Sequence, residues 1–89
     1  MSIKHKIVKI NDKNGLHLRA AAKIAEKSRQ YDASVKLCKD DQCADGASVM
    51  ELLMLDAGSE SKIRLEVSGN EAERMLEELS IFFIDGAGI

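Results

Sequence analysis

The sequence has few aromatic residues and no long apolar run. Its 89 residues include one Tyr, two Phe and no Trp, so it lacks the stacking side chains by which many proteins bind single-stranded nucleic acids. Its net charge of −2 also differs from the basic charge of such proteins. No segment approaches the roughly 20 apolar residues of a membrane span. The lysine-rich first ten residues do not resemble a signal peptide. We therefore expect a cytoplasmic monomer that binds neither nucleic acid nor membrane.

Cysteine and histidine are also scarce, with two of each. A structural zinc site needs about four ligands and would have to use all of these residues, at spacings that match no standard pattern, so we expect no metal. Cys38 and Cys43 flank four polar residues and could face each other across a hairpin. That placement is compatible with a disulfide, but we favour two free thiols. A Gly-rich loop with a nucleotide-binding lysine is also missing, and we expect no cofactor.

Charge is distributed unevenly along the chain. Residues 1–39 contain ten Lys and Arg and three acids, a net +7, whereas residues 40–89 contain three and twelve, a net −9. The two halves could interleave in space and cancel. Alternatively, the basic half could present a positive surface to an anion or an acidic partner. Both interpretations stay open.

Periodicity predicts the fold class. At this length a chain builds one core, so we expect a single domain over residues 1–89. Apolar and polar residues alternate as in strands around 8–10, 34–38, 42–45 and 62–67, and recur at helical spacing in 20–30, 48–55 and 72–83. The order is βαββαβα. Because the strands alternate cleanly, we expect an α+β open-faced sandwich: a four-stranded antiparallel sheet covered on one face by three helices.

The candidate chemistry lies at residues 14–21, where a glycine turn leads from a strand into an amphipathic helix and places His17 at the helix start. The first backbone N–H groups of a helix have no partner within the helix and favour an anion. Imidazole is nucleophilic near neutral pH, and the planar guanidinium of Arg19 could hold phosphoryl oxygens. A lone histidine at this point is more often a polar cap, so spacing alone does not decide. His5 has the strand parity opposite to Val8 and is expected to be exposed and uninvolved.

A wider pattern favours the chemical interpretation. Gly-Leu-His-x-Arg-x-Ala occupies residues 15–21, SVMELLMLDA occupies residues 48–57, and a strand ends at Ser68-Gly69. From Lys6 to Phe83 this arrangement resembles the HPr family of phosphocarriers in sugar and nitrogen phosphotransferase systems. Residues 52–56 look more like the nitrogen-related branch, called NPr.

The resemblance implies a role for each residue of the first motif. His17 would accept a phosphoryl group on Nδ1 from enzyme I, itself charged by phosphoenolpyruvate, and donate it to an enzyme IIA-type domain. Arg19 would bind the phosphoryl group. The chain would thus be a phosphoryl-transfer intermediate, not a stand-alone catalyst. One residue departs from the family pattern: members usually have Pro after the arginine, whereas this chain has Ala20 and no Pro at all. Ala20 makes the helix start less rigid and adds a backbone donor.

Ser48 has two interpretations. It aligns with the serine that a dedicated kinase phosphorylates, and a phosphorylase can dephosphorylate, in some family members. Ser48 and Glu51 also match a capping box, with the hydroxyl as N-cap of the second helix. We favour capping over regulation.

The helix that follows Ser48 carries more apolar residues than one face can bury. Val49, Leu52 and Leu55 share one arc, whereas Met50, Leu53 and Met54 share the other, which should be partly exposed. The family resemblance places this second arc beside the histidine and makes it a partner-binding surface, together with Leu18 and Ala20. The alternative function is therefore a non-catalytic regulatory module that docks partners through Met50 and Leu53.

Overall fold

The computed structural model describes residues 3–11 and 13–84, whose helices and strands follow the predicted order βαββαβα. The ends of the expected domain, residues 1 and 89, lie outside these ranges. Within them, no helix is both long enough and apolar enough to span a bilayer. The strands are β1 (Lys4–Lys9), β2 (Ser34–Lys39), β3 (Gln42–Asp45) and β4 (Lys62–Ser68), and the helices are α1 (Leu18–Arg29), α2 (Val49–Met54) and α3 (Ala72–Ile84).

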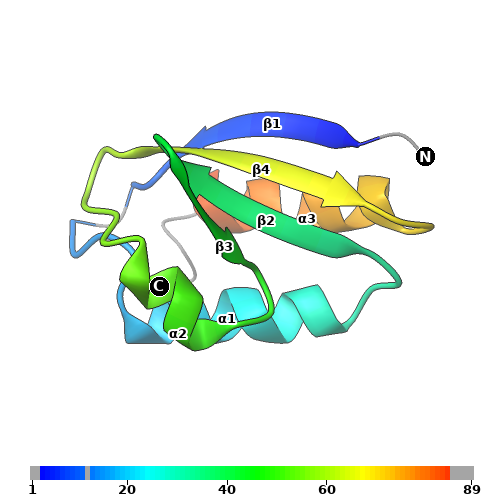
Figure 1. Ribbon diagram of the computed structural model, residues 1–89, viewed down its shortest axis with the longest axis horizontal. Helices are drawn as coiled ribbons and strands as arrows, with labels where there is room; N and C mark the ends of the chain where they lie inside the picture. The colour runs from blue at the N-terminus through cyan, green and yellow to red at the C-terminus, as the bar shows by residue number, and fades with distance from the viewer. Residues whose placement is uncertain (1–2, 12, 85–89) are drawn as a thin grey trace.

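The four strands form one antiparallel sheet in the order β1-β4-β2-β3. The helices lie together on one side of it, with α1 and α2 below the sheet and α3 behind it in the view of Figure 1. Helix α3 packs on β1 and β4, whereas α2 packs on α1 and β3. The predicted α+β open-faced sandwich is confirmed.

Alternation along the strands separates the two faces of the sheet. In β4, Ile63, Leu65 and Val67 are fully buried beneath the helices, while Lys62 and Arg64 are exposed on the other face. Helices α1 and α3 bury one stripe each against the same core. The largest fully buried side chains are Phe83, Ile10, Ile24, Leu37, Leu52, Ile63, Leu65, Met75, Leu79 and Val67.

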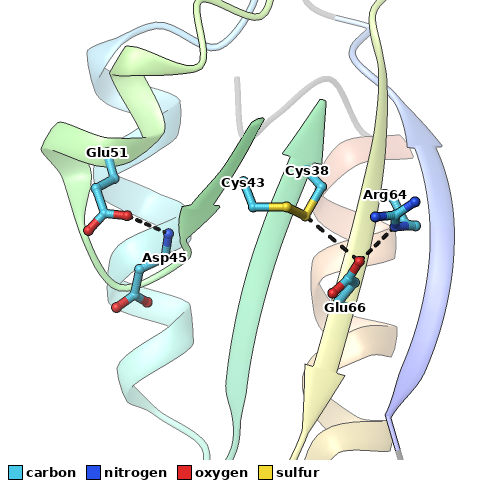
Figure 2. Close-up of a disulfide and its surroundings, with 6 residues drawn as sticks. All are labelled: Cys38, Cys43, Asp45, Glu51, Arg64 and Glu66. Carbon is cyan, nitrogen blue, oxygen red and sulfur yellow. Dashed lines mark hydrogen bonds and ion pairs between the residues drawn. A yellow bond between two sulfur atoms is a disulfide. The ribbon is translucent and has the colours of Figure 1, made fainter. Parts of the chain in front are cut away.

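The expectation of two free thiols is wrong, because Cys38 and Cys43 form a disulfide (Figure 2). Strands β2 and β3 are joined by the two residues Asp40 and Asp41, and Asp40 has a left-handed φ of +54°, which aspartate tolerates better than most residues. This tight turn makes Cys38 and Cys43 direct register partners. Sequence spacing was compatible with that pairing, but only the register brings the two sulfur atoms together.

Candidate functional site

His17 is the N-cap of α1. Its backbone is extended, with φ −86° and ψ 176°, and its carbonyl accepts the first helical hydrogen bond, 2.9 Å from Ala21 N. Its Nδ1 accepts a hydrogen bond from Ala20 N at 3.3 Å. A ring nitrogen can accept only when it carries no proton, so this contact fits the neutral imidazole with its proton on Nε2. The Nδ1 lone pair is thus directed at the first turn of the helix.

The loop before His17 is held by the segment that follows α2. Leu16 N donates to Ala57 O at 2.8 Å, and His17 N donates to Gly15 O at 3.0 Å. Gly15 has a φ of +69°, and a Cβ at this position would lie 2.5 Å from Ala57 O and 2.8 Å from the Cα of Gly58. Only glycine fits this close approach without strain. Ala57 closes the segment 48–57 of the sequence motif, but no sequence pattern places Ala57 or Gly58 beside Gly15, because they are distant from it in the chain.

The first turn of α1 is suited to an anion. It contains no acidic residue, and its backbone N–H groups sit at the positive end of the helix dipole. Arg19 lies in this turn and is exposed. An incoming phosphoryl group at Nδ1 would therefore meet backbone donors and could be approached by a guanidinium, which binds such oxygens bidentately.

Ala20 contributes to the site around His17 through its backbone N–H, not through its side chain. We expected it among the partner-binding residues, but its side chain is fully buried. Its N–H points at His17 Nδ1, and a proline at this position would have no hydrogen to donate. The departure from the family pattern therefore has a direct structural effect at the nitrogen expected to react.

The apolar residues of α2 and of its C-cap, Leu55, divide as their spacing predicts. Leu52 and Leu55 are buried, and Val49 packs partly against the core. On the opposite side Met50 is 73% exposed, Met54 72% and Leu53 38%. Leu18, the first residue of α1, is 63% exposed. We call Leu18, Met50, Leu53 and Met54 the docking surface. Because α2 packs on α1, this surface belongs to the same end of the molecule as the start of α1 (Figure 1).

Ser48 caps α2, since its hydroxyl accepts a hydrogen bond from Glu51 N at 3.2 Å. The reciprocal half of the expected capping box is replaced. The Glu51 carboxylate accepts instead from Asp45 N at 3.1 Å, and Ser48 N donates to Asp45 O at 3.0 Å. The last residue of β3 is thus bonded to the first turn of α2. Arg29 donates to Ala47 O at 3.0 Å from the C-terminal end of α1, which fixes the same junction.

His5 is exposed on β1, facing Glu66 of β4 on the uncovered side of the sheet. Helix α1 lies on the opposite side of the sheet, so the two histidines lie on different faces of the molecule. Among residues 3–11 and 13–84, no three His, Cys, Asp or Glu side chains form a group that could hold a metal ion.

Comparisons with known proteins match both the sequence and the architecture. Residues 4–85 match the family described as "PTS HPr component phosphorylation site". Phosphocarrier protein NPr of Shewanella violacea is 38% identical over 72 residues, covering 81% of this chain and 79% of the relative. Phosphocarrier protein HPr of Pseudomonas aeruginosa is 34% identical over 73 residues, covering 81% of each. The crystal structure of a phosphocarrier protein HPr from Bacillus anthracis superposes with a TM-score of 0.88 at 29% identity, covering 93% of this chain and 99% of that one. With this fold, a histidine at the start of α1 and these relatives, the chain belongs to the HPr family of phosphocarrier proteins.

Proposed function

We propose that this chain carries a phosphoryl group on His17 Nδ1, accepting it from enzyme I and donating it to an enzyme IIA-type domain. The observation that supports this most directly is the direction of the Nδ1 lone pair, which meets the N-terminus of α1 through Ala20 N. A phosphoryl group attached there would be surrounded by backbone donors. The same position at the surface, with His17 partly exposed, leaves room for a partner's phosphorylated residue to approach in line.

The transfer needs little from the chain beyond positioning. Nδ1 attacks the phosphorus atom, the bond between phosphorus and the donor's atom breaks, and the three phosphoryl oxygens turn toward the donors of the first helical turn. In this proposal Arg19 neutralises part of their charge. The N–P bond is labile, so a suitable acceptor can take the group in a second displacement at the same phosphorus. The chain is an intermediate that is regenerated in each cycle.

The proposal also includes how the chain contacts its partners and in which compartment it acts. The docking surface would contact enzyme I and the IIA-type domain in turn, since exposed Met and Leu side chains adapt to several partners. The whole chain, 1–89, would act as one domain and as a monomer in the cytoplasm, where phosphoenolpyruvate is available. Ser48 would serve as a helix cap in this cycle, because its hydroxyl already accepts from Glu51 N.

The proposal is tested by incubating the chain with phosphoenolpyruvate and an enzyme I shown to charge its own carrier. We expect one phosphoryl adduct by intact mass, stable in base and lost in acid, that maps to His17. Adding IIA-type domains from the sugar and nitrogen systems in separate reactions should discharge it. If no adduct forms, the carrier function is wrong and the non-catalytic docking module takes its place. A single acid-stable adduct on Ser48 would also contradict it.

Replacing Ala20 by Pro should lower the phosphorylated fraction at equilibrium with enzyme I. The variant loses the N–H that we expect to move from Nδ1 to a phosphoryl oxygen. A hydrogen bond to a charged group contributes more than the neutral one it replaces, and a net difference of about 1 kcal/mol corresponds to a roughly fivefold change. Ala20→Gly keeps the N–H and is the matched control. An Ala20→Pro variant that is phosphorylated as fully as the unmodified chain would show that this donor is irrelevant.

Replacing Met50 by Glu should weaken the productive encounter with enzyme I. Met50 is exposed, so the free energy of unfolding should change by about 0.5 kcal/mol or less. A charge in the middle of an apolar contact should raise the KM for this chain roughly tenfold with little change in kcat. Ile81→Glu, at an exposed apolar position of α3, is the control. Equal KM values for the two variants would argue against a docking role for α2.

A further inference from the structure

The Cys38–Cys43 disulfide lies on the face of the sheet that no helix covers. The neighbouring pair in the register, Leu37 and Ala44, is buried beneath the helices, so the next pair points to the opposite face. Cys38 lies on the inner strand β2 and is only 3% exposed, whereas Cys43 is exposed on the edge strand β3. The bond thus joins a buried residue on an inner strand to an exposed residue at the sheet edge.

The sulfur of the buried residue, Cys38, has a hydrogen-bond acceptor beside it. Cys38 Sγ lies 3.8 Å from Glu66 Oε2, and Arg64 Nε donates to the same oxygen at 2.7 Å (Figure 2). A disulfide sulfur has no hydrogen to donate, so this contact gives the oxidised chain no hydrogen bond. A Cys38 thiol would have one, and its proton would point at a carboxylate that Arg64 already holds in place. In the reduced state, the Cys38 thiol therefore has a hydrogen-bond acceptor, the Glu66 carboxylate, already in position.

We propose that Cys38 and Cys43 form a reversible thiol–disulfide exchange site that a dithiol reductant opens from the Cys43 side. A thiolate of the reductant attacks Cys43 Sγ, the Cys38–Cys43 bond breaks, and Cys38 Sγ leaves as a thiolate. It takes up a proton from solvent and becomes a thiol, whose S–H donates a hydrogen bond to Glu66. The second thiolate of the reductant then attacks its own sulfur in the mixed disulfide and releases Cys43. Two electrons and two protons pass to the chain, and the reductant becomes a disulfide.

Opening the bond should loosen β3 first. This strand has four residues and pairs with one neighbour only, β2, so the disulfide is its single covalent tie to the sheet within the described residues besides the hairpin turn. Its last residue, Asp45, is bonded to Glu51 and Ser48 at the start of α2. Weaker pairing of β3 should therefore also loosen the start of α2, through the hydrogen bonds that join them. The exchange chemistry is independent of phosphoryl transfer. Only the expectation that loosening α2 alters partner binding at the docking surface rests on the proposed function.

The test begins with the native full-length chain and a thiol-alkylating reagent, read by intact mass. Before reduction we expect no alkylation, and after treatment with dithiothreitol without denaturant we expect two alkyl groups. Amide hydrogen exchange over residues 42–54 should then become roughly threefold faster or more, while β1 and α3 stay unchanged. Alkylation before reduction, a bond that opens only in denaturant, or exchange that does not respond would each overturn the proposal.

A matched pair of variants tests the side of attack. With glutathione disulfide, Cys38→Ser leaves the thiol of the exposed residue Cys43 and should form a mixed disulfide at least roughly tenfold faster than Cys43→Ser, which leaves the thiol of the buried residue Cys38. Equal rates would contradict opening from the Cys43 side. The double variant, with both cysteines replaced by serine, should show the faster amide exchange of the reduced chain with or without dithiothreitol. None of these measurements depends on enzyme I, so failure here and failure of the carrier function are distinguishable.

Discussion

His17→Ala should lose phosphorylation by enzyme I entirely, at least a thousandfold below the unmodified chain by the intact-mass assay, because the attacking nitrogen is gone. The helix also loses its N-cap contact to Ala20 N, which should lower the free energy of unfolding by about 0.5–2 kcal/mol. That loss leaves a folded protein, as a thermal melt would show. The absence of an adduct would then reflect lost chemistry.

Two control variants separate the nucleophile from the cap and from the other histidine. His17→Asn supplies an oxygen that can accept from the first turn of α1, so it should recover most of the stability and none of the phosphorylation. His5→Ala changes an exposed residue of β1 and should be phosphorylated as fully as the unmodified chain. An acid-labile adduct that survives in His17→Asn, or disappears in His5→Ala, would contradict the assignment of His17.

Gly15→Ala should destabilise the chain by about 2–3 kcal/mol, since it combines a left-handed φ of +69° with a Cβ placed 2.5 Å from Ala57 O. For a domain of this size, that loss lowers Tm by roughly 10–20 °C. The clash should also displace the hydrogen bond from Leu16 N to Ala57 O, and with it His17. Below its melting temperature the variant should therefore accept phosphoryl groups about tenfold more slowly.

Gly58→Ala is the matched control, because a Cβ at Gly58 would have no heavy atom within 4 Å. We expect its free energy of unfolding to change by about 0.5 kcal/mol or less and its phosphorylation rate to be unchanged. Differential scanning calorimetry and the enzyme I assay measure the two effects separately. If Gly15→Ala melts and reacts like Gly58→Ala, the contact with Ala57 does not hold the loop that carries His17.

Local periodicity predicted the elements wherever one face of the chain is apolar and the other polar. β4 is the clearest case, with Ile63, Leu65 and Val67 all facing the core. β1 was predicted only around 8–10, yet it runs Lys4–Lys9, because lysines occupy both of its faces near the edge of the sheet and hide the alternation. α1 begins at Leu18, before its first buried residue, Ala20, so its first turn has no apolar signal.

The candidate site divides in the same way between local and long-range features. The position of His17 at the start of α1 and the exposed arc of α2 follow from local spacing, and the structure has both. The contact of Gly15 with Ala57, the burial of Ala20 and the redirected carboxylate of Glu51 depend on how distant segments pack. No local pattern encodes such contacts. The disulfide belongs with them, because the cysteine spacing allows the bond but only the hairpin register forms it.

The strand order β1-β4-β2-β3 leaves β1 and β3 at the two edges of the sheet, where unpaired backbone groups invite a strand from another molecule. β1 places Lys4 and Lys6 on the side that faces α3, and Lys4 pairs there with Glu73 at 3.0 Å. β3 ends after four residues and turns into α2. The lysines of β1 at one edge and the short length of β3 at the other oppose the pairing of a strand from another molecule. We therefore expect this fold to resist aggregation through its sheet edges.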